Sequence, residues 1–278
     1  MTLPGVIDLH THSTASDGRC TPEELVSRAA RAGVTVLALT DHDTFAGCAA
    51  AAAACVRHGV DFVTGIEITA VAGGRDVHVL GYFCDPNTPA LEAFLASQRE
   101  NRVDRVRQIV QRLAALGVTL DADAILRPAT ADSSKAVGRP WIARALVEAG
   151  YVETVNQAFE LWLASGRPAF VPRAGASLQA VFGQIHEAGG LASLAHPGLV
   201  RHDEWIPALA ASGLDAIEAF HSDHDAATTE RYLSLARDLN LLVTGGSDYH
   251  ADEAHGGGGP GSVSLPQDQF ERLLARRG

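Results

Sequence analysis

Short apolar runs that stop abruptly at a polar or ionisable residue recur along this chain. They span residues 6–10, 35–42, 61–67, 76–83, 191–196, 214–221 and 241–250. The first two flank a helical pattern that begins with Thr21 and Pro22 and ends at Gly33, and further helical patterns separate later runs. Strands that alternate with helices form parallel βα units. We therefore predict a seven-stranded α/β fold, with a hairpin at Gly73–Gly74 between the third and fourth strands.

Residues 86–172 interrupt this alternation. Residues 89–116 have the pattern of one long Arg-rich helix, and 139–164 that of two more. The sequence therefore predicts a strand-bearing domain from residues 1–85 and 173–278, with 86–172 as a helical insertion subdomain. After the last strand, the glycine-rich tail from His255 predicts a flexible loop, and 267–277 a terminal helix.

Nearly every predicted strand ends in a potential metal ligand. These residues are His10, His12, His42, Glu67, His78, His196, His221, Asp248 and His250. The C-terminal ends of parallel strands converge on one face of a βα barrel, and residues at i and i+2 project to the same side. Imidazole and carboxylate without thiolate favour Mn, with Fe or Zn as alternatives, and the number of ligands predicts two or three ions. The four cysteines form no CxxC pair and are expected to be reduced.

All of the potential metal ligands except His221 lie in six short segments: DLHTHSTASDG (8–18), LTDHDT (39–44), GIEIT (65–69), VHVLGY (77–82), LAHPG (194–198) and GSDYH (246–250). Together the segments resemble the polymerase-and-histidinol-phosphatase (PHP) family of metal-dependent phosphoesterases. The resemblance implies a distorted seven-stranded (β/α) barrel with three ions. It assigns His10, His12, Glu67 and Asp248 to one ion, Glu67, His78 and His196 to a second, and Asp17, His42 and His250 to a third.

The insertion contains a candidate anion site. Ser134, Lys135 and Arg139 precede or begin a helix, where hydroxyls, positive charge and a helix N-terminus favour anions, although an ordinary polar loop is the alternative. His224 is a further candidate substrate ligand. On the preceding helix Arg99, Arg102 and Arg105 recur at i+3 spacing, which we interpret as a solvated face.

The resemblance is strongest to the PHP subgroup that acts on nucleoside 3′,5′-bisphosphates and short oligoribonucleotides. It implies removal of the 3′-phosphate from a nucleoside 3′,5′-bisphosphate. Histidinol-phosphate phosphatase and a non-catalytic, metal-stabilised nucleotide-binding module are the alternatives. HxH pairs also occur in amidohydrolases, but many of those bridge two metals with a carbamylated Lys, and Lys135, the only Lys, lies in the insertion and not at a strand end.

Activated water is the expected nucleophile, because no Ser or Cys lies in a nucleophile elbow. His221 is the expected proton donor, since it ends a strand on the same rim and completes none of the three ion shells. Asp43 and His224 are weaker candidates for that role.

The net charge and the hydropathy of the chain argue against some classes of binding partner. The formal net charge of -11 disfavours duplex DNA. No apolar run approaches the ~18 residues of a membrane span, and the first residues lack the features of a signal peptide. We expect a cytoplasmic enzyme with a small phosphorylated nucleotide as substrate, short single-stranded RNA as a further one, and no membrane or obligate protein partner.

Overall fold

The computed structural model describes residues 5–251 and 258–277, so part of the predicted tail loop, including His255, lies outside the described residues. Seven strands form one sheet in chain order. They are β1 (Val6–Asp8), β2 (Val34–Leu39), β3 (Asp61–Ala72), β4 (Arg75–Tyr82), β5 (Leu191–Leu194), β6 (Ala216–His221) and β7 (Leu242–Gly246). The predicted number of strands is confirmed.

The fourth strand runs against the other six. β4 pairs antiparallel with both β3 and β5, whereas every other neighbouring pair is parallel. The reversal occurs at Gly73 and Gly74, whose φ angles of 55° and 74° lie in the left-handed region that glycine adopts without strain. The predicted hairpin is therefore confirmed, and it places His78 opposite Thr69 in the middle of a strand rather than at its end.

The first and last strands approach each other just beyond their ends. The Leu9 amide donates to the Gly245 carbonyl at 3.2 Å, and Thr11 and Tyr249 form an isolated parallel bridge. This contact brings together the segments that carry His10, His12 and Asp248.

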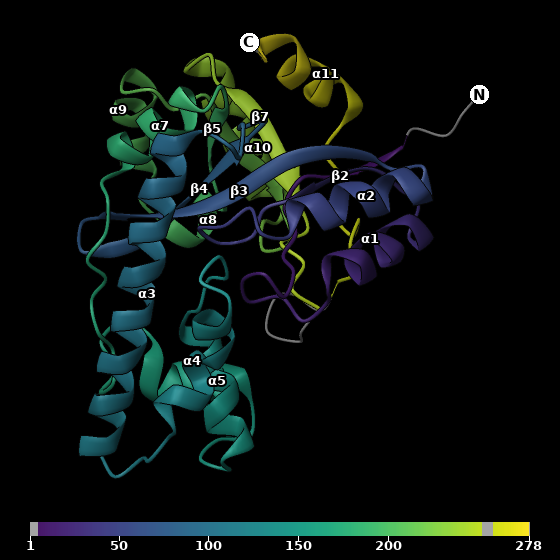
Figure 1. Ribbon diagram of the computed structural model, residues 1–278. Coiled ribbons are helices and arrows are strands. Elements are labelled where there is room, and N and C mark those ends of the chain that lie inside the picture. The colour runs from purple at the N-terminus through teal and green to yellow at the C-terminus, as the bar shows by residue number, and fades with distance from the viewer. Residues whose placement is uncertain (1–4, 252–257, 278) are drawn as a thin grey trace.

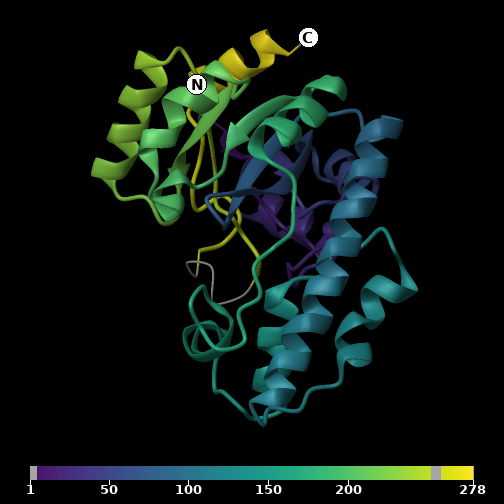
Figure 2. The same cartoon turned by 90° about the vertical axis from the view of Figure 1, so that its left-hand side faces the viewer.

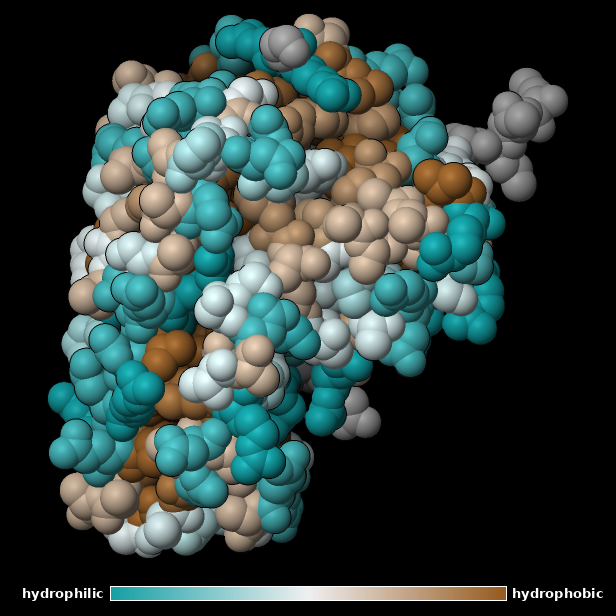
Figure 3. All heavy atoms as spheres, viewed as in Figure 1, coloured by the Kyte–Doolittle hydropathy of each residue, from teal (hydrophilic) through white to brown (hydrophobic). Residues whose placement is uncertain are grey.

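Helices cover the outside of the sheet (Figure 1). They are α1 (Pro22–Arg31), α2 (Cys48–His58), α7 (Leu178–Glu187), α8 (Pro197–Val200), α9 (Ile206–Ala211), α10 (Ala226–Asp238) and α11 (Gln267–Arg276). The start of α1 has a capping box, in which the Thr21 side chain accepts from the Glu24 amide and the Glu24 carboxylate accepts from the Thr21 amide. The outer face of α2 is apolar, with Ala49 and Ala53 exposed and Val56 84% exposed, and appears as a tan area in Figure 3.

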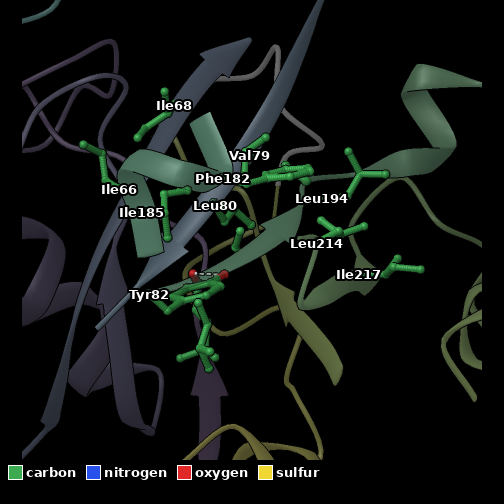
Figure 4. Close-up of a cluster of buried hydrophobic side chains, with 14 of the residues drawn as sticks. Ile66, Ile68, Val79, Leu80, Tyr82, Phe182, Ile185, Leu194, Leu214 and Ile217 are labelled. Atoms are coloured by element: carbon green, nitrogen blue, oxygen red, sulfur yellow. Dashed lines mark hydrogen bonds between the residues drawn. The ribbon is translucent and has the colours of Figure 1, made fainter. Parts of the chain in front are cut away.

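One part of the hydrophobic core lies between the sheet and α7 (Figure 4). Ile66 and Leu80 from the hairpin and Phe182 and Ile185 from α7 are all 1% exposed or less. Tyr82 is buried among them, and its hydroxyl donates to the Leu9 carbonyl at 2.9 Å. The same cluster thus fixes the central hairpin relative to β1, which precedes the first histidines.

The helices between β4 and α7 form a lobe that extends from the sheet (Figures 1 and 2). Its helices are α3 (Pro89–Ala115), α4 (Ala122–Ala131), α5 (Arg139–Glu148) and α6 (Val155–Ala158), followed by a π-helical turn at Phe159–Leu163. The sequence did not predict α4. A hydrophobic cluster whose buried members all lie between residues 106 and 171 gives this lobe a core of its own.

The interpretation of the α3 arginine stripe as a solvated face is wrong. Arg99, Arg102 and Arg105 are only 8%, 9% and 8% exposed. All three bind acceptors inside the protein, so this face of α3 points toward the sheet and the loops that follow its strands.

Among the described residues, no helix combines the length and apolar character needed to cross a bilayer.

Candidate metal centre

Two completely buried histidines follow β1 and meet a carboxylate that follows β7. The Nε2 atoms of His10 and His12 each lie 3.2 Å from Oδ1 of Asp248. The i, i+2 spacing of the two histidines directs both rings to one side of the chain. The approach of the first and last strands supplies the carboxylate that both rings face.

Glu67 of β3 lies at the centre of the cluster. Its two carboxylate oxygens lie 2.8–3.5 Å from imidazole nitrogens of His10, His12, His42, His78 and His196. Burial opposes ionisation of Glu67, but His42, His78 and His10 outweigh burial and hold its pKa well below the usual range. A carboxylate whose oxygens face separate sets of imidazoles can bridge neighbouring divalent ions.

A third group of ligands surrounds Asp17. Its oxygens lie 3.3 Å from Nε2 of His250, 3.6 Å from Nε2 of His42 and 3.7 Å from Nδ1 of His12. The structure therefore brings all nine residues that the PHP resemblance assigns as ligands into one continuous cluster. His42 links its parts, because its other nitrogen lies 3.1 Å from Glu67.

The cluster fits divalent metal ions on its own chemistry. Three groups drawn from the nine residues each place their ligand atoms within 4.8 Å of one another. Nε2 of His10, both nitrogens of His12 and Nδ1 of His42 are buried but make no hydrogen bond. Buried polar atoms without partners are rare in folded proteins, and nitrogen and oxygen donors without sulfur suit Mn, Fe or Zn.

Protons and metal ions would compete for these nitrogens. Burial favours neutral imidazole, but the carboxylates of Asp248 and Glu67 beside the ring raise the pKa of His12 to about 10. Burial dominates at His42 and lowers its pKa to about 3. Since a ligating imidazole must be deprotonated, ion binding at His12 would release a proton.

Glu218 supports the cluster and was missed by the sequence analysis. Its Oε1 accepts from Nδ1 of His10 at 2.9 Å, and its Oε2 accepts from the backbone amide of His196 at 2.7 Å. The first bond leaves Nε2 of His10 free to face Asp248, as carboxylates behind metal-binding histidines do. The second holds His196 at a φ of 28°, an uncommon angle for a residue other than glycine.

Two further buried carboxylates hold the ligand-bearing loops. Asp41 accepts from the amide and hydroxyl of Ser13 and from the hydroxyl of Ser16, and so fixes the loop before Asp17. Asp8 accepts from the amide and hydroxyl of Ser247, next to Asp248. The available sequence signal was a carboxylate beside or within a buried apolar run, because buried carboxylates require partners.

His221 lies at the edge of the cluster in a defined tautomer. Its Nδ1 accepts from the backbone amide of Asp223 at 3.1 Å, so the neutral ring carries its proton on Nε2, 3.5 Å from Oδ2 of Asp248. The ring also falls into a possible ligand group with His10 and Glu218. A nitrogen that carries a proton cannot also ligate an ion, so in this tautomer Nε2 of the neutral ring is not a metal ligand.

The other two candidates for the proton donor have their polar atoms engaged. His224 accepts the Gly198 amide at Nε2, which leaves the proton on Nδ1 to donate to the Ala219 carbonyl. Burial lowers the pKa of His224 and keeps this ring neutral. The Asp43 carboxylate accepts from Arg102 and Arg173. The backbone contacts of His224 hold the turn that follows His196, so its position indicates support rather than substrate contact.

Residues of the candidate anion loop line two separate cavities. Arg139 and Gly138 line a cavity of about 210 Å³ together with His42 and His78 of the metal cluster. Ser134 lines a separate groove, its hydroxyl donates to Asp132, and its carbonyl accepts from Thr44. Lys135 is half-buried and does not belong to the described lining of the cavity. Of the three loop residues, only Arg139 thus shares a cavity with the cluster.

Comparisons with known proteins identify similar chains. A model of the PHP domain matches residues 8–143. The chain is 38% identical to a 3′,5′-nucleoside bisphosphate phosphatase of Chromobacterium violaceum, over 88% of this chain and 87% of that protein. It is 37% identical to the 5′-3′ exoribonuclease Rnm of Salmonella typhimurium, over 88% and 85%. A solved structure from Bifidobacterium adolescentis, assigned as a metal-dependent phosphoesterase, is 33% identical with a TM-score of 0.89 and covers 99% of this chain and 98% of that one.

Proposed function

Because the chain belongs to the PHP family of metal-dependent phosphoesterases, we propose that it removes the 3′-phosphate from nucleoside 3′,5′-bisphosphates, for example converting adenosine 3′,5′-bisphosphate to AMP and phosphate. One observation carries the proposal: His42 and His78 of the metal cluster line the same cavity as four arginines, Arg102, Arg105, Arg139 and Arg173. A substrate with two phosphates presents one group to each. A relative of similar length, the Chromobacterium violaceum enzyme, is named for this substrate class.

We propose Mn²⁺ as the resident ion, in two or three copies. His10, His12, Glu67 and Asp248 would hold one ion, Glu67, His78 and His196 a second, and Asp17, His42 and His250 a third. Bound divalent ions would supply Lewis-acid charge to the phosphate and lower the pKa of water. Glu218 orients His10 for this task through the hydrogen bond to Nδ1.

His221 is the proposed proton donor to the departing alkoxide. To act as an acid the ring must carry a proton on each nitrogen. Nε2, 3.5 Å from Oδ2 of Asp248, would give its proton to the alkoxide, and Nδ1 would keep its own, so that the ring returns to neutral imidazole. The ring is 3% exposed, so bulk water does not compete for that proton in the closed site. Asp248 lies next to Nε2 and orients the ring.

We assign metal binding and substrate binding to different parts of the chain. Residues 1–85 and 173–278 form the proposed barrel domain, which carries all nine metal ligands. Residues 86–172 form the proposed substrate-binding subdomain, with Arg139 at the cavity and Ser134 and Lys135 on the adjoining loop. The separate hydrophobic cluster of residues 106–171 supports a subdomain that begins within α3, because Leu91 and Leu95 at the start of that helix pack into the core of the sheet-bearing part.

A phosphate-release screen tests the function. Purified protein in buffer with Mn²⁺ is given nucleoside 3′,5′-bisphosphates, histidinol phosphate and short oligoribonucleotides. The oligoribonucleotides are included because the Salmonella typhimurium relative is named as an exoribonuclease. We expect the highest kcat/KM on a nucleoside bisphosphate. A tenfold preference for histidinol phosphate or for oligoribonucleotides, or no release from any substrate with Mn²⁺, Fe²⁺ or Zn²⁺, would overturn the proposal.

A further inference from the structure

Asp17 lies much farther from the sheet along the chain than the other eight candidate ligands do. His12 and His250 are the farthest of those eight, and each lies four residues beyond the end of its strand, β1 or β7. Asp17 lies nine residues beyond the end of β1, in a turn that we call the Asp17 loop (residues 13–18). The position of its carboxylate therefore depends on contacts of this loop and not on the strand ladder.

Three successive backbone carbonyls of the Asp17 loop, at residues 15–17, each accept a hydrogen bond from the helical lobe. The donors are the Ala136 amide, Nε1 of the Trp141 indole and Nη1 of Arg144, at 3.0, 3.1 and 3.1 Å respectively. Buried carbonyls need such partners, because burial removes them from water. The backbone of the loop is thus bound to the lobe, while the Asp17 carboxylate faces the histidines of the cluster.

Two of the three donors come from one face of α5. Trp141 and Arg144 are three positions apart, so their side chains are neighbours on the helix. The Arg144 guanidinium carbon lies 5.1 Å from the centroid of the indole ring, a cation–π contact that links the two side chains. The opposite side of α5 is fixed, because Ile142 and Leu146 are fully buried in the core of the lobe. The helix therefore offers both donors from a rigid position.

The far side of the Asp17 loop is held by the sheet-bearing part of the chain. Ser16 contacts both sides, because its hydroxyl donates to Asp41 at 2.6 Å and its carbonyl accepts from Trp141. Ser16 is 0% exposed, so water does not replace a lost donor at that carbonyl. At Gly18 a Cβ would lie 2.5 Å from the His12 carbonyl oxygen, so the end of the loop packs directly on the ligand-bearing backbone. The loop is thus held between Asp41 and α5.

We propose that Trp141 and Arg144 are positioning residues for Asp17, and that the helical lobe thereby holds the ion assigned to Asp17, His42 and His250. The inference deepens the proposed function and rests on its metal centre. A ligand must be held within about 0.5 Å of its working position, and groups behind the ligands supply that constraint. The ligand sets of the other two ions contain no residue of the Asp17 loop. Loss of the α5 contacts should therefore weaken one ion and spare the others.

Two substitutions with matched controls test the positioning role. Trp141→Phe keeps an aromatic ring and removes the N–H that donates to the loop. Trp162→Phe is its control, because this buried indole Nε1 in the same lobe makes no hydrogen bond. Arg144→Met keeps the length of the side chain and removes its donors. Arg107→Met is the second control, because this α3 side chain is 56% exposed.

Metal affinity is the first readout, measured on the full-length protein by competition between Mn²⁺ sites and a chelator. Asp17→Asn identifies the ion that Asp17 binds. We expect Trp141→Phe and Arg144→Met each to weaken that same ion about tenfold or more and to leave the other ions within about twofold of wild type. Trp162→Phe and Arg107→Met should bind every ion as wild type does.

Hydrogen exchange with and without Mn²⁺ is the second readout. The amides of residues 13–18 should exchange faster in Trp141→Phe and Arg144→Met than in wild type, and at the wild-type rate in both controls. Faster exchange in the absence of Mn²⁺ as well would show that α5 holds the loop before any ion binds, as the structure indicates. Wild-type exchange of this loop in both α5 variants would overturn the inference.

Three metal-binding results would also overturn it: an Asp17→Asn protein that loses no ion, folded α5 variants with wild-type affinity for every ion, or equal weakening of all ions. Thermal melting identifies the folded variants. None of these readouts requires turnover. A protein that shows the selective metal loss but releases no phosphate from nucleoside bisphosphates would reject the proposed function and support the inference.

Discussion

Glu218→Gln probes the support of the metal centre with almost no change in volume. The wild-type carboxylate accepts two hydrogen bonds at once, from Nδ1 of His10 at 2.9 Å and from the His196 amide at 2.7 Å. A glutamine has one oxygen and one NH₂ group. Whichever way the amide is turned, one of the two donors faces another donor. The variant must therefore lose one of the two contacts.

The free-energy cost of the lost hydrogen bond gives the expected decrease in metal affinity. Glu218 and His10 are both 0% exposed, so water does not replace the missing acceptor. A buried donor left without a partner costs ~1–3 kcal/mol, and 1.4 kcal/mol corresponds to about tenfold in an equilibrium constant. We therefore expect metal affinity to fall by roughly 10–100-fold, the range typical of carboxylates behind metal-binding histidines.

Competition with a metal chelator measures this affinity directly. Glu230→Gln is the control, because the Glu230 side chain is 73% exposed on α10 and touches only Arg237 among the ion pairs of the described chain. Thermal melting of both variants checks the fold. A Glu218→Gln protein that melts like wild type and binds Mn²⁺ within twofold of wild type would refute the positioning role of Glu218.

Four further outcomes are expected. Elemental analysis should find two or three ions per wild-type chain and a greater loss of metal in Glu67→Gln than in any single His→Asn variant; one ion or fewer in active wild-type protein would reject a multinuclear centre. Lys135→Ala should raise KM while metal content is retained, and wild-type kinetics on every substrate would remove Lys135 from the binding site. His221→Asn should lower kcat by ~10² or more with metals retained, and by less on p-nitrophenyl phosphate, whose leaving group needs no proton; an equal loss on both substrates would assign the proton to another donor. Gly198→Ala should lower the melting temperature, because the added Cβ would lie 2.7 Å from Nε2 of His224 and overpacking of this kind costs ~1–3 kcal/mol; an unchanged melting temperature would contradict the supporting role of His224.

Local sequence patterns predicted most of the helices and strands but did not predict α4. The seven strands and the Gly73–Gly74 hairpin follow from apolar runs and turn residues, whose signals lie within a few positions of one another. The α4 helix contains Pro128, which signals a helix end in sequence. Packing of Ile125 and Leu126 into the core of the insertion retains the helix in spite of that signal.

The sequence by itself determined which residues could bind metal. Histidines and carboxylates in or at the ends of apolar runs converge when those runs become strands of one sheet, so eight of the nine candidate ligands could be named without knowing a single distance, and the resemblance to the PHP family added Asp17. Their number and the absence of thiolates also indicated more than one divalent ion.

Only the tertiary structure decided what surrounds that cluster. Arg102 and Arg173 are far apart in sequence yet share Asp43, and the same i+3 stripe would describe a solvated helix face if nothing packed against α3. Glu218 acts on His10 from 208 positions away, through a hydrogen bond that no local spacing encodes. Periodicity reports which face of an element is apolar, whereas the free energy of a buried charge depends on which partners the fold brings to it.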